Sequence, residues 1–200
     1  IGIIEVGLGG RLDSTNIIQP VLSVITNIGM DHTEFLGNTL EKIAAEKAGI
    51  IKDKTPVVIG EAIDITRPVF ERTAKTHHAK IIFAQEEYQA EYGMLSMNGH
   101  QIVQISDKKK NTGFSMETDL PGFYQRKNLV TSLAALDELT ANGFHVSSDH
   151  MNTGMKNVKK NTGLRGRWDI CLKSPLLICD TAHNAGGIAE VIRQIAETPY

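Results

Sequence analysis

Short apolar runs alternate along the chain with segments in which apolar residues recur every three or four positions. Four runs bounded by Gly and Pro predict β-strands: IGIIEV (1–6), PVLSVITNI (20–28), TPVVIG (55–60) and AKIIFA (79–84). Continuous apolar strands that alternate with helices are typical of a parallel sheet covered by helices. The pattern therefore predicts an α/β fold with a mostly parallel sheet and flanking helices.

The helical periodicity predicts helices over residues 38–52, 66–78 and 125–143. In the first, Asn38 is the expected capping residue, Glu41 has the capping-box spacing and Gly49 marks the end. In the second, Pro68 lies in the first turn, where its missing N–H does no harm. The third is amphipathic and ends at Gly143.

The remaining segments predict a change of architecture. Short alternating stretches between Glu87 and Glu117, separated by Asn-Gly and charged turns, predict an antiparallel meander or hairpins attached to the main sheet. The polar, basic segment 155–163 is interpreted as a linker, with a domain boundary near Asn161. Beyond it, GRWDICL, PLLICD and AGGIAEVIRQIAE predict two strands and a helix, too few elements to close a core. We therefore expect two domains, residues 1–161 and 162–200, the first beginning in mid-fold and the second cut short.

The composition excludes several classes of protein. With 41% hydrophobic residues and a formal net charge of −2, the chain has no general electrostatic reason to bind nucleic acid or an anionic membrane. Cys171 and Cys179 lie outside any CxxC pair and are interpreted as small buried side chains in a reducing compartment. No apolar run approaches the roughly 20 residues that cross a bilayer, and the first residues lack the basic, apolar and small-residue order of a signal peptide. We expect a cytoplasmic protein.

Polar side chains at two strand ends indicate a metal site. Glu5 follows an apolar run and precedes the glycines of GLGG, and a carboxylate in that position is costly unless it is paired or binds a metal. The second strand ends in ITNIGMDHTEFLG, which would bring Asp31 and His32 beside Glu5. These ligands, with water and phosphate oxygens, suit Mg²⁺ or Mn²⁺. The alternatives are a plain tight turn and a histidine that caps the following loop.

Lys47 shares the apolar stripe of Ile43 and Ala44 on the first predicted helix. An ammonium there would be repelled by a nearby metal ion. Either its stem extends toward the helix C-terminus, or its amine is converted by carbon dioxide into a carbamate, an anion that holds a divalent cation. The residues alone leave both options open.

Three further motifs carry groups that bind anions or nucleotides. Asn128 lies at the opening of the third predicted helix, where N–H groups are unpaired. In RGRW, Arg165 and Arg167 have the fork geometry that suits phosphate oxygens. LLICDTAHNAGG delivers Asp180 and His183 between an apolar strand and a glycine-led helix. An ordinary helix start and two surface arginines are the alternative interpretations.

Taken together, these motifs resemble the folylpolyglutamate synthases, including the bifunctional bacterial form that is also a dihydrofolate synthase, within the Mur ligase superfamily. The most specific matches are EVGLGGRLDSTN and ITNIGMDHTEFLGNTLEKIAAEKAGIIK, and GFYQRKN, GRW and DTAHNAGG follow in the family's order. The resemblance covers nearly the whole chain. It implies an incomplete central ATPase domain with a small antiparallel section, followed by the start of a Rossmann-like C-terminal domain.

The resemblance also implies roles for individual residues. Glu5 and His32 would be magnesium ligands, and Lys47 would be the lysine that the family carbamylates. Asp13 would lie on the pterin or folate side of the site.

For the nucleotide, the resemblance implies that Asn128, Arg167, Asp180 and His183 hold ATP. Arg167 and His183 would lie near its phosphates and Asp180 near its ribose. Lys47, Arg167 and His183 would be the catalytic residues.

The implied activity is the ATP-dependent addition of L-glutamate to folates, and to dihydropteroate, through an acyl phosphate. Two positions depart from the family, Tyr124 in place of His and Ala185 in place of Pro, and no GxxxxGK[ST] loop occurs. We therefore expect the 200-residue chain to be inactive alone and to bind nucleotide weakly. Another Mur-type amide ligase and a non-catalytic nucleotide-binding module are the alternatives.

Overall fold

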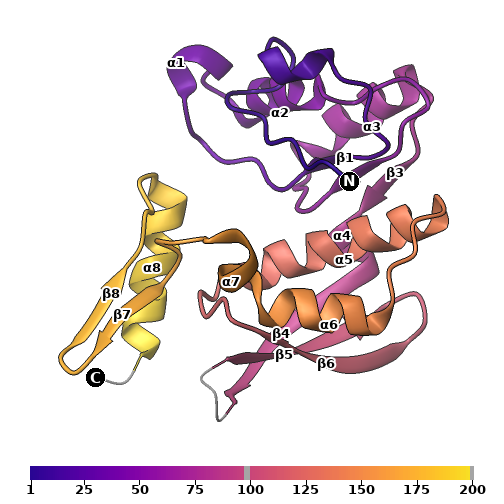
Figure 1. The fold of residues 1–200 in the computed structure, drawn as a ribbon. Helices are drawn as coiled ribbons and strands as arrows, with labels where there is room; N and C mark the ends of the chain where they lie inside the picture. The colour runs from indigo at the N-terminus through magenta and orange to yellow at the C-terminus, as the bar shows by residue number, and fades with distance from the viewer. Residues whose placement is uncertain (97–99, 199–200) are drawn as a thin grey trace. The chain divides into compact units, whose positions relative to one another are not determined.

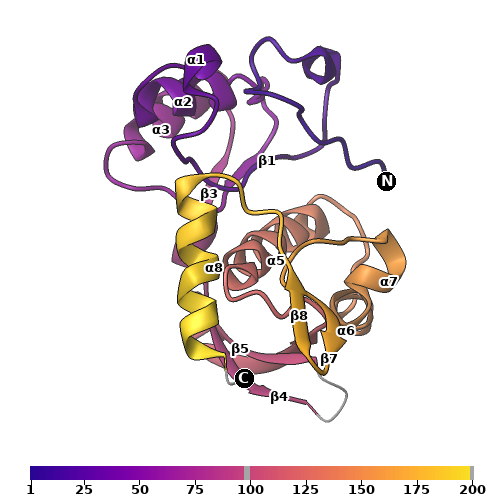
Figure 2. The ribbon, with the colours of Figure 1, turned by 90° about the vertical axis from the view of Figure 1, so that its left-hand side faces the viewer.

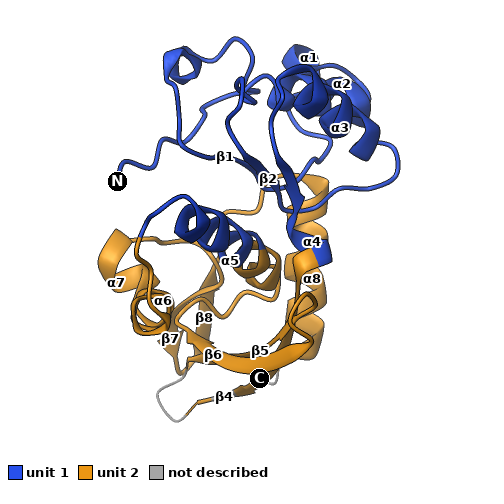
Figure 3. Ribbon diagram, turned by 90° about the vertical axis from the view of Figure 1, so that its right-hand side faces the viewer, with its two compact units in different colours: residues 1–86, 131–144 blue, residues 87–130, 145–200 orange. Residues whose placement is uncertain are grey.

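The computed structural model (Figure 1, Figure 2) describes residues 1–96 and 100–198. It divides into two compact units (Figure 3). Unit 1 consists of residues 1–86 and 131–144, and unit 2 of residues 87–130 and 145–200. Helix α5 (Gln125–Ala141) contributes its first residues to unit 2 and the rest to unit 1.

Unit 1 is built on a parallel sheet of three strands in the order β1 (Ser23–Ile25), β2 (Val57–Ile59) and β3 (Ile81–Phe83). Its helical elements are η1 (Ser14–Ile17), α1 (Thr33–Leu36), α2 (Leu40–Ala48), α3 (Arg67–Thr76) and α4 (Ala84–Glu87). All residues of β2 are buried, and Phe70 of α3 is fully enclosed in the same core. Three of the four predicted strands and the parallel α/β arrangement are confirmed.

The predicted helices are confirmed with small shifts at their ends. Helix α2 is capped by Thr39, whose side chain accepts the Lys42 N–H (3.3 Å), rather than by Asn38. It ends at Gly49 as expected. Helix α3 has its proline in the first turn, and α5 is followed by Gly143 at a φ of +91°.

The predicted strand over residues 1–6 is wrong. This stretch is irregular, and Ile1 and Ile3 expose 89% and 94% of their surface. An apolar run forms a strand only where a neighbour completes its backbone hydrogen bonds, and no strand of the described residues pairs with this one. Glu5 is consequently an exposed side chain rather than a buried carboxylate at a strand end.

Unit 2 contains the predicted antiparallel meander, formed by β4 (Tyr88–Leu95), β5 (Gln101–Asp107) and β6 (Thr112–Thr118). It is a sheet of its own, so the prediction that it attaches to the parallel sheet is wrong. Val103, Ile105 and Met116 form the buried face of the meander. The predicted Asn-Gly turn at 98–99 lies outside the described residues.

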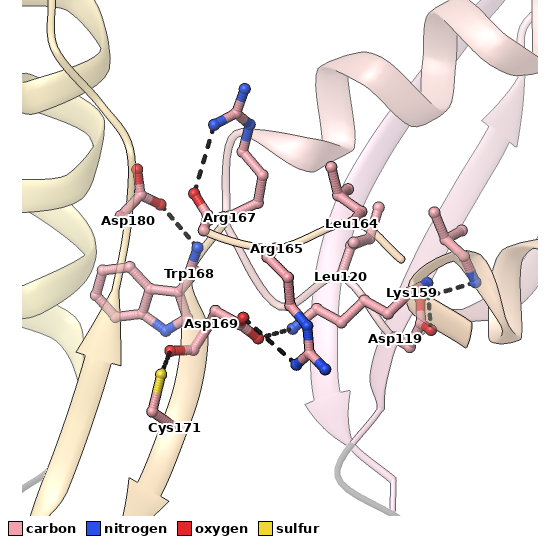
Figure 4. A network of polar contacts seen from close by, with 12 residues as sticks. Asp119, Leu120, Lys159, Leu164, Arg165, Arg167, Trp168, Asp169, Cys171 and Asp180 are labelled. Atoms are coloured by element: carbon pink, nitrogen blue, oxygen red, sulfur yellow. Dashed lines mark hydrogen bonds and ion pairs between the residues drawn. The ribbon is translucent and has the colours of Figure 1, made fainter. Parts of the chain in front are cut away.

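The segment interpreted as a linker is helical. It spans the end of α6 (Ser148–Lys156) and α7 (Val158–Thr162). Asp119 accepts the N–H groups of Val158 (3.1 Å) and Lys159 (2.9 Å), and Asp169 accepts the Lys159 ammonium (2.9 Å; Figure 4). Asp119 lies 39 and 40 residues before the N–H groups that it accepts, so local composition did not reveal this contact. The compact units do not separate at Asn161, and a family domain boundary there stays a prediction.

The C-terminal part of unit 2 has the predicted elements: strands β7 (Asp169–Lys173) and β8 (Leu176–Cys179), paired antiparallel, and helix α8 (Ala185–Glu197). The interpretation of Cys171 and Cys179 as buried is wrong, because both thiols are free and exposed. Within residues 1–96 and 100–198, no helix has the length and apolarity needed to cross a bilayer.

We expect Gly60→Ala to destabilise unit 1. A Cβ at Gly60 would lie 2.3 Å from both the Thr131 hydroxyl and the Thr26 carbonyl oxygen, so neighbouring backbone must move. Overpacking of this kind lowers the free energy of unfolding by about 1–3 kcal/mol. Urea denaturation followed by circular dichroism measures it. Gly29→Ala, which meets no atom within 4 Å, is the matched control, and equal stabilities for the two variants would contradict the assignment.

Candidate functional site

The glycine-rich loop, residues 7–13, is organised by the carboxylate of Asp13. Its Oδ2 accepts the N–H groups of Gly7 (3.1 Å) and Leu8 (3.0 Å). Its Oδ1 accepts the N–H (2.9 Å) and the hydroxyl (2.6 Å) of Thr15, so Asp13 is the N-cap of η1. The Thr15 hydroxyl and these amides lower the pKa of Asp13 to about 2. The carboxylate thus uses its acceptor positions to fold its own loop.

The same loop lies against the C-terminal end of α2. The Arg11 N–H donates to the Glu46 carbonyl oxygen (2.9 Å), and the two side chains form an ion pair (2.9 Å). A Cβ at Gly10 would lie 3.0–3.1 Å from the carbonyl oxygens of Glu46 and Lys47, so only glycine allows this approach. The structure therefore brings the glycine-rich loop to the helical turn that carries Lys47.

Lys47 is partly exposed in the last turn of α2, while Ile43 and Ala44 of its stripe are buried. Its amine makes no hydrogen bond or ion pair with the part of the chain that the structure describes. The position at the helix C-terminus agrees with the extended-stem interpretation and leaves the amine accessible to carbon dioxide. Carbamylation of Lys47 stays a prediction.

Glu5, Asp31 and His32 do not form the expected ligand group. Across residues 1–96 and 100–198 no group of three or more His, Cys, Asp or Glu side chains is placed to hold a metal ion. The His32 N–H donates to Asp31 Oδ1 (2.9 Å), and His32 caps α1 with a left-handed φ of 48°. The strand-end arrangement expected for these residues is absent because residues 1–6 do not form a strand beside β1, and Glu5 and His32 as metal ligands stay a prediction.

In unit 2, three of the predicted nucleotide residues converge on the loop that follows β8. The Arg167 guanidinium donates to the Thr181 hydroxyl, and the His183 ring bonds the Thr181 carbonyl oxygen (3.0 Å). Asp180 accepts the Trp168 N–H at Oδ2 (2.7 Å; Figure 4) and the Ala182 N–H at Oδ1 (2.9 Å). Arg167 and His183 are exposed and Asp180 is half-buried, so the cluster faces solvent.

The contact to the Thr181 carbonyl oxygen sets the tautomer of His183. A carbonyl oxygen only accepts, so Nδ1 carries the proton and the neutral ring has its lone pair on Nε2. His183 can therefore donate from Nε2 to a phosphate oxygen only as the imidazolium, in which both ring nitrogens carry a proton. Asn184 follows as the N-cap of α8, with its Oδ1 accepting the Gly187 N–H (2.8 Å).

Asn128 lies outside this cluster and donates to Gln125 Oε1 within α5 (2.8 Å). The link between the two segments is Tyr124, whose hydroxyl donates to Asp180 Oδ2 (2.7 Å). Sequence reasoning missed Thr181, the partner of Arg167, and Gln194, a buried polar residue of α8. No signal in the sequence marked Gln194, which lies off the stripe of Ile188, Ile192 and Ile195 on the same helix.

Comparisons with known proteins bear on the family and the fold. A family model described as the Mur ligase middle domain matches residues 1–136. The dihydrofolate synthase/folylpolyglutamate synthase of Bacillus subtilis (strain 168) is 37% identical over 204 residues, which cover 96% of this chain and 44% of that relative. The chain thus spans less than half the length of this relative.

Two solved structures extend the comparison. An FPGS–AMPPCP–folate complex has 28% sequence identity and a TM-score of 0.85, covering 97% of this chain and 46% of that one. E. coli FolC in complex with DHPP and ADP has 29% identity and a TM-score of 0.78, with 98% and 42% covered. The fold expected from the sequence is confirmed by this likeness.

We expect Asp13→Asn to loosen the glycine-rich loop, because an amide nitrogen cannot accept hydrogen bonds. Hydrogen exchange should become several-fold faster at the N–H groups of Gly7, Leu8 and Thr15. Asp64→Asn, at an exposed aspartate of the same unit, should leave these rates unchanged. Unaltered exchange in Asp13→Asn would show that the loop does not depend on this carboxylate.

The same contacts predict a pH dependence. The folded pKa of Asp13, about 2, lies below the ordinary value of 3.8. The ionised carboxylate therefore favours the folded loop fully above about pH 4, and this contribution is lost as the pH falls toward 2. An NMR titration of the Asp13 carboxyl group measures the midpoint, and a midpoint near 3.8 would contradict the structural role.

Proposed function

Because this chain belongs to the Mur ligase family through its middle domain, we propose that the protein carrying it is an ATP-dependent ligase that adds L-glutamate to folates and to dihydropteroate. The observation that carries the proposal is the convergence of Arg167, Asp180 and His183 on the loop after β8. The named relatives support the substrates, since one structure contains AMPPCP and folate and another contains ADP and DHPP.

The chemistry begins with activation of a carboxylate, which by itself resists attack by an amine. ATP transfers its terminal phosphoryl group to a carboxylate oxygen of the folate, giving an acyl phosphate and ADP. The glutamate amine then attacks the acyl carbon, phosphate leaves, and the nitrogen loses a proton. Binding groups that hold the transferring phosphoryl group lower the barrier without covalent chemistry of their own.

In this proposal the cluster after β8 binds ATP. The Arg167 guanidinium suits phosphate oxygens, and His183 as an imidazolium donates from Nε2 to the same groups. Asp180 accepts a ribose hydroxyl, and Asn128 also contacts the nucleotide. Arg167 and His183 act in catalysis because charge accumulates on the phosphoryl oxygens during transfer.

Glu5 and His32 are proposed as magnesium ligands because a carboxylate oxygen and an imidazole nitrogen are donors that suit this ion. The described residues contain no group of three or more His, Cys, Asp or Glu side chains placed to hold the ion, and we assign the ion no step of the reaction. Lys47, with its accessible amine at the end of α2, is proposed to form a carbamate, in which the amine bonds the carbon of CO₂ and releases a proton. Asp13 remains proposed on the folate side. The cytoplasm is the proposed compartment, which the two free thiols support.

We expect the protein at its full natural length to convert dihydropteroate and tetrahydrofolate, each with ATP and glutamate, into products heavier by one glutamate. ADP and phosphate should appear in equal amounts with the product, as measured by mass spectrometry and phosphate release. Ligation of a UDP-linked precursor instead would indicate another Mur-type ligase. Nucleotide binding without any ligation would indicate a non-catalytic module.

Two neighbouring arginines provide a matched pair of variants. Arg167→Ala should lower the rate of ligation about a hundredfold or more, because a charged group on the phosphoryl oxygens is lost. Arg165→Ala should keep the rate, since the Arg165 side chain is 84% exposed and lies 3.8 Å from Asp169 instead. Equal rates for both variants would remove Arg167 from the site.

The metal proposal has its own test. Glu5→Gln and His32→Ala should raise the magnesium concentration needed for ligation while circular dichroism shows a folded protein. Glu41→Gln, in the first turn of α2, is the control for a lost carboxylate. An unchanged magnesium requirement in both variants would reject the two ligands.

A further inference from the structure

The hydroxyl of Tyr124 joins two segments of unit 2 that are far apart in the sequence. It lies just before α5 and donates to Asp180 Oδ2, just after β8, over 2.7 Å. Burial, and then the hydrogen bond to Asp180, raise the pKa of Tyr124 above its ordinary value of 10. Tyr124 therefore keeps its proton at neutral pH, and Asp180 accepts the hydrogen bond from its hydroxyl.

The carboxylate of Asp180 is nearly saturated by the protein. Tyr124 and the Trp168 N–H both donate to Oδ2, and the Ala182 N–H donates to Oδ1. A carboxylate offers about four acceptor positions, so one remains, on Oδ1. With Tyr124 in place, the carboxylate is held at both oxygens and presents a single acceptor to a ligand.

The backbone before Tyr124 is itself fixed at three successive residues, 121–123. Gln194 donates from Nε2 to the carbonyl oxygen of the first (2.9 Å) and accepts the N–H of the third at Oε1 (2.7 Å). Tyr92 donates to the carbonyl oxygen of the second (2.6 Å). Gln194 exposes only 3% of its surface, so these bonds are shielded from water. The direction of the Tyr124 side chain is thereby set.

Gly122 leaves the space that the Tyr124 ring occupies. A Cβ at Gly122 would lie 2.8 Å from Cζ and 3.1 Å from the hydroxyl oxygen of Tyr124. Any larger residue would push the ring away and lengthen its bond to Asp180. The contact between Tyr124 and Asp180 thus depends on a glycine two residues earlier in the chain.

We propose that Tyr124 is a positioning residue of the nucleotide site, which holds Asp180 so that its remaining acceptor receives a ribose hydroxyl. This inference rests on the proposed function, which places the ribose at Asp180. Tyr124 itself does not touch the reacting atoms. Its effect should appear only for ligands that carry the ribose hydroxyls.

The test compares ADP with 2′,3′-dideoxy-ADP by calorimetric titration of the protein at its full natural length. The unaltered protein should bind ADP more tightly, because the dideoxy analogue cannot donate to Asp180. Tyr124→Phe should weaken ADP binding about tenfold, the equivalent of one hydrogen bond to a charged group, and leave dideoxy-ADP binding unchanged. Gly122→Ala, which displaces the ring, should show the same selective loss.

The other outcomes overturn the inference in distinguishable ways. If Tyr124→Phe weakens both nucleotides equally, Tyr124 has only a structural role. If the variant binds ADP as well as or better than the unaltered protein, Tyr124 does not position the carboxylate. If the unaltered protein does not distinguish the two nucleotides, the ribose assignment in the proposed function is the step that fails.

Discussion

Backbone hydrogen bonding between neighbouring strands is the constraint on which the rest of this structure depends. Strands β1 and β3 complete the hydrogen-bond ladder of β2 in parallel register, and all residues of β2 are buried in a core to which α2 and α3 contribute. The run at residues 1–6 is also mostly apolar but has no partner strand among the described residues, and it stays irregular and largely exposed. An apolar run can therefore form a strand, but it does so only where a neighbouring strand pairs with it.

This constraint explains which elements could be predicted from the sequence. The helices α2, α3 and α5 were predictable because their signals, a capping residue, a first-turn proline and a terminal glycine, are local. Helix α7 was not, because the carboxylate of Asp119 that caps it lies about 40 residues earlier in the chain. The sequence also did not reveal that the meander forms a separate sheet, since the partner of a strand is determined by the whole fold.

The residues of the candidate site also fall into two groups, those whose arrangement could be predicted from the sequence and those whose arrangement could not. The arrangement of Arg167, Asp180 and His183 follows from two short segments at the ends of paired strands, β7 and β8, and was predictable. The sequence argument for Glu5 and His32 relied on a strand over residues 1–6 that does not form, so their pairing stays a prediction. Residues such as Gln194 act through backbone groups of a distant loop, and a single sequence carries no sign of such partners.

Two aspartates show how the number of acceptor positions limits what a carboxylate can do. Asp13 receives four hydrogen bonds from its own loop, so a ligand could bind it only by displacing one of them. Asp180 receives three and keeps one position, which is compatible with a ligand hydroxyl. Of two motif aspartates that look alike in the sequence, geometry thus favours Asp13 as a residue that shapes the site and Asp180 as one that contacts the ligand. The difference depends on donors supplied by other segments, above all the hydroxyl of Tyr124.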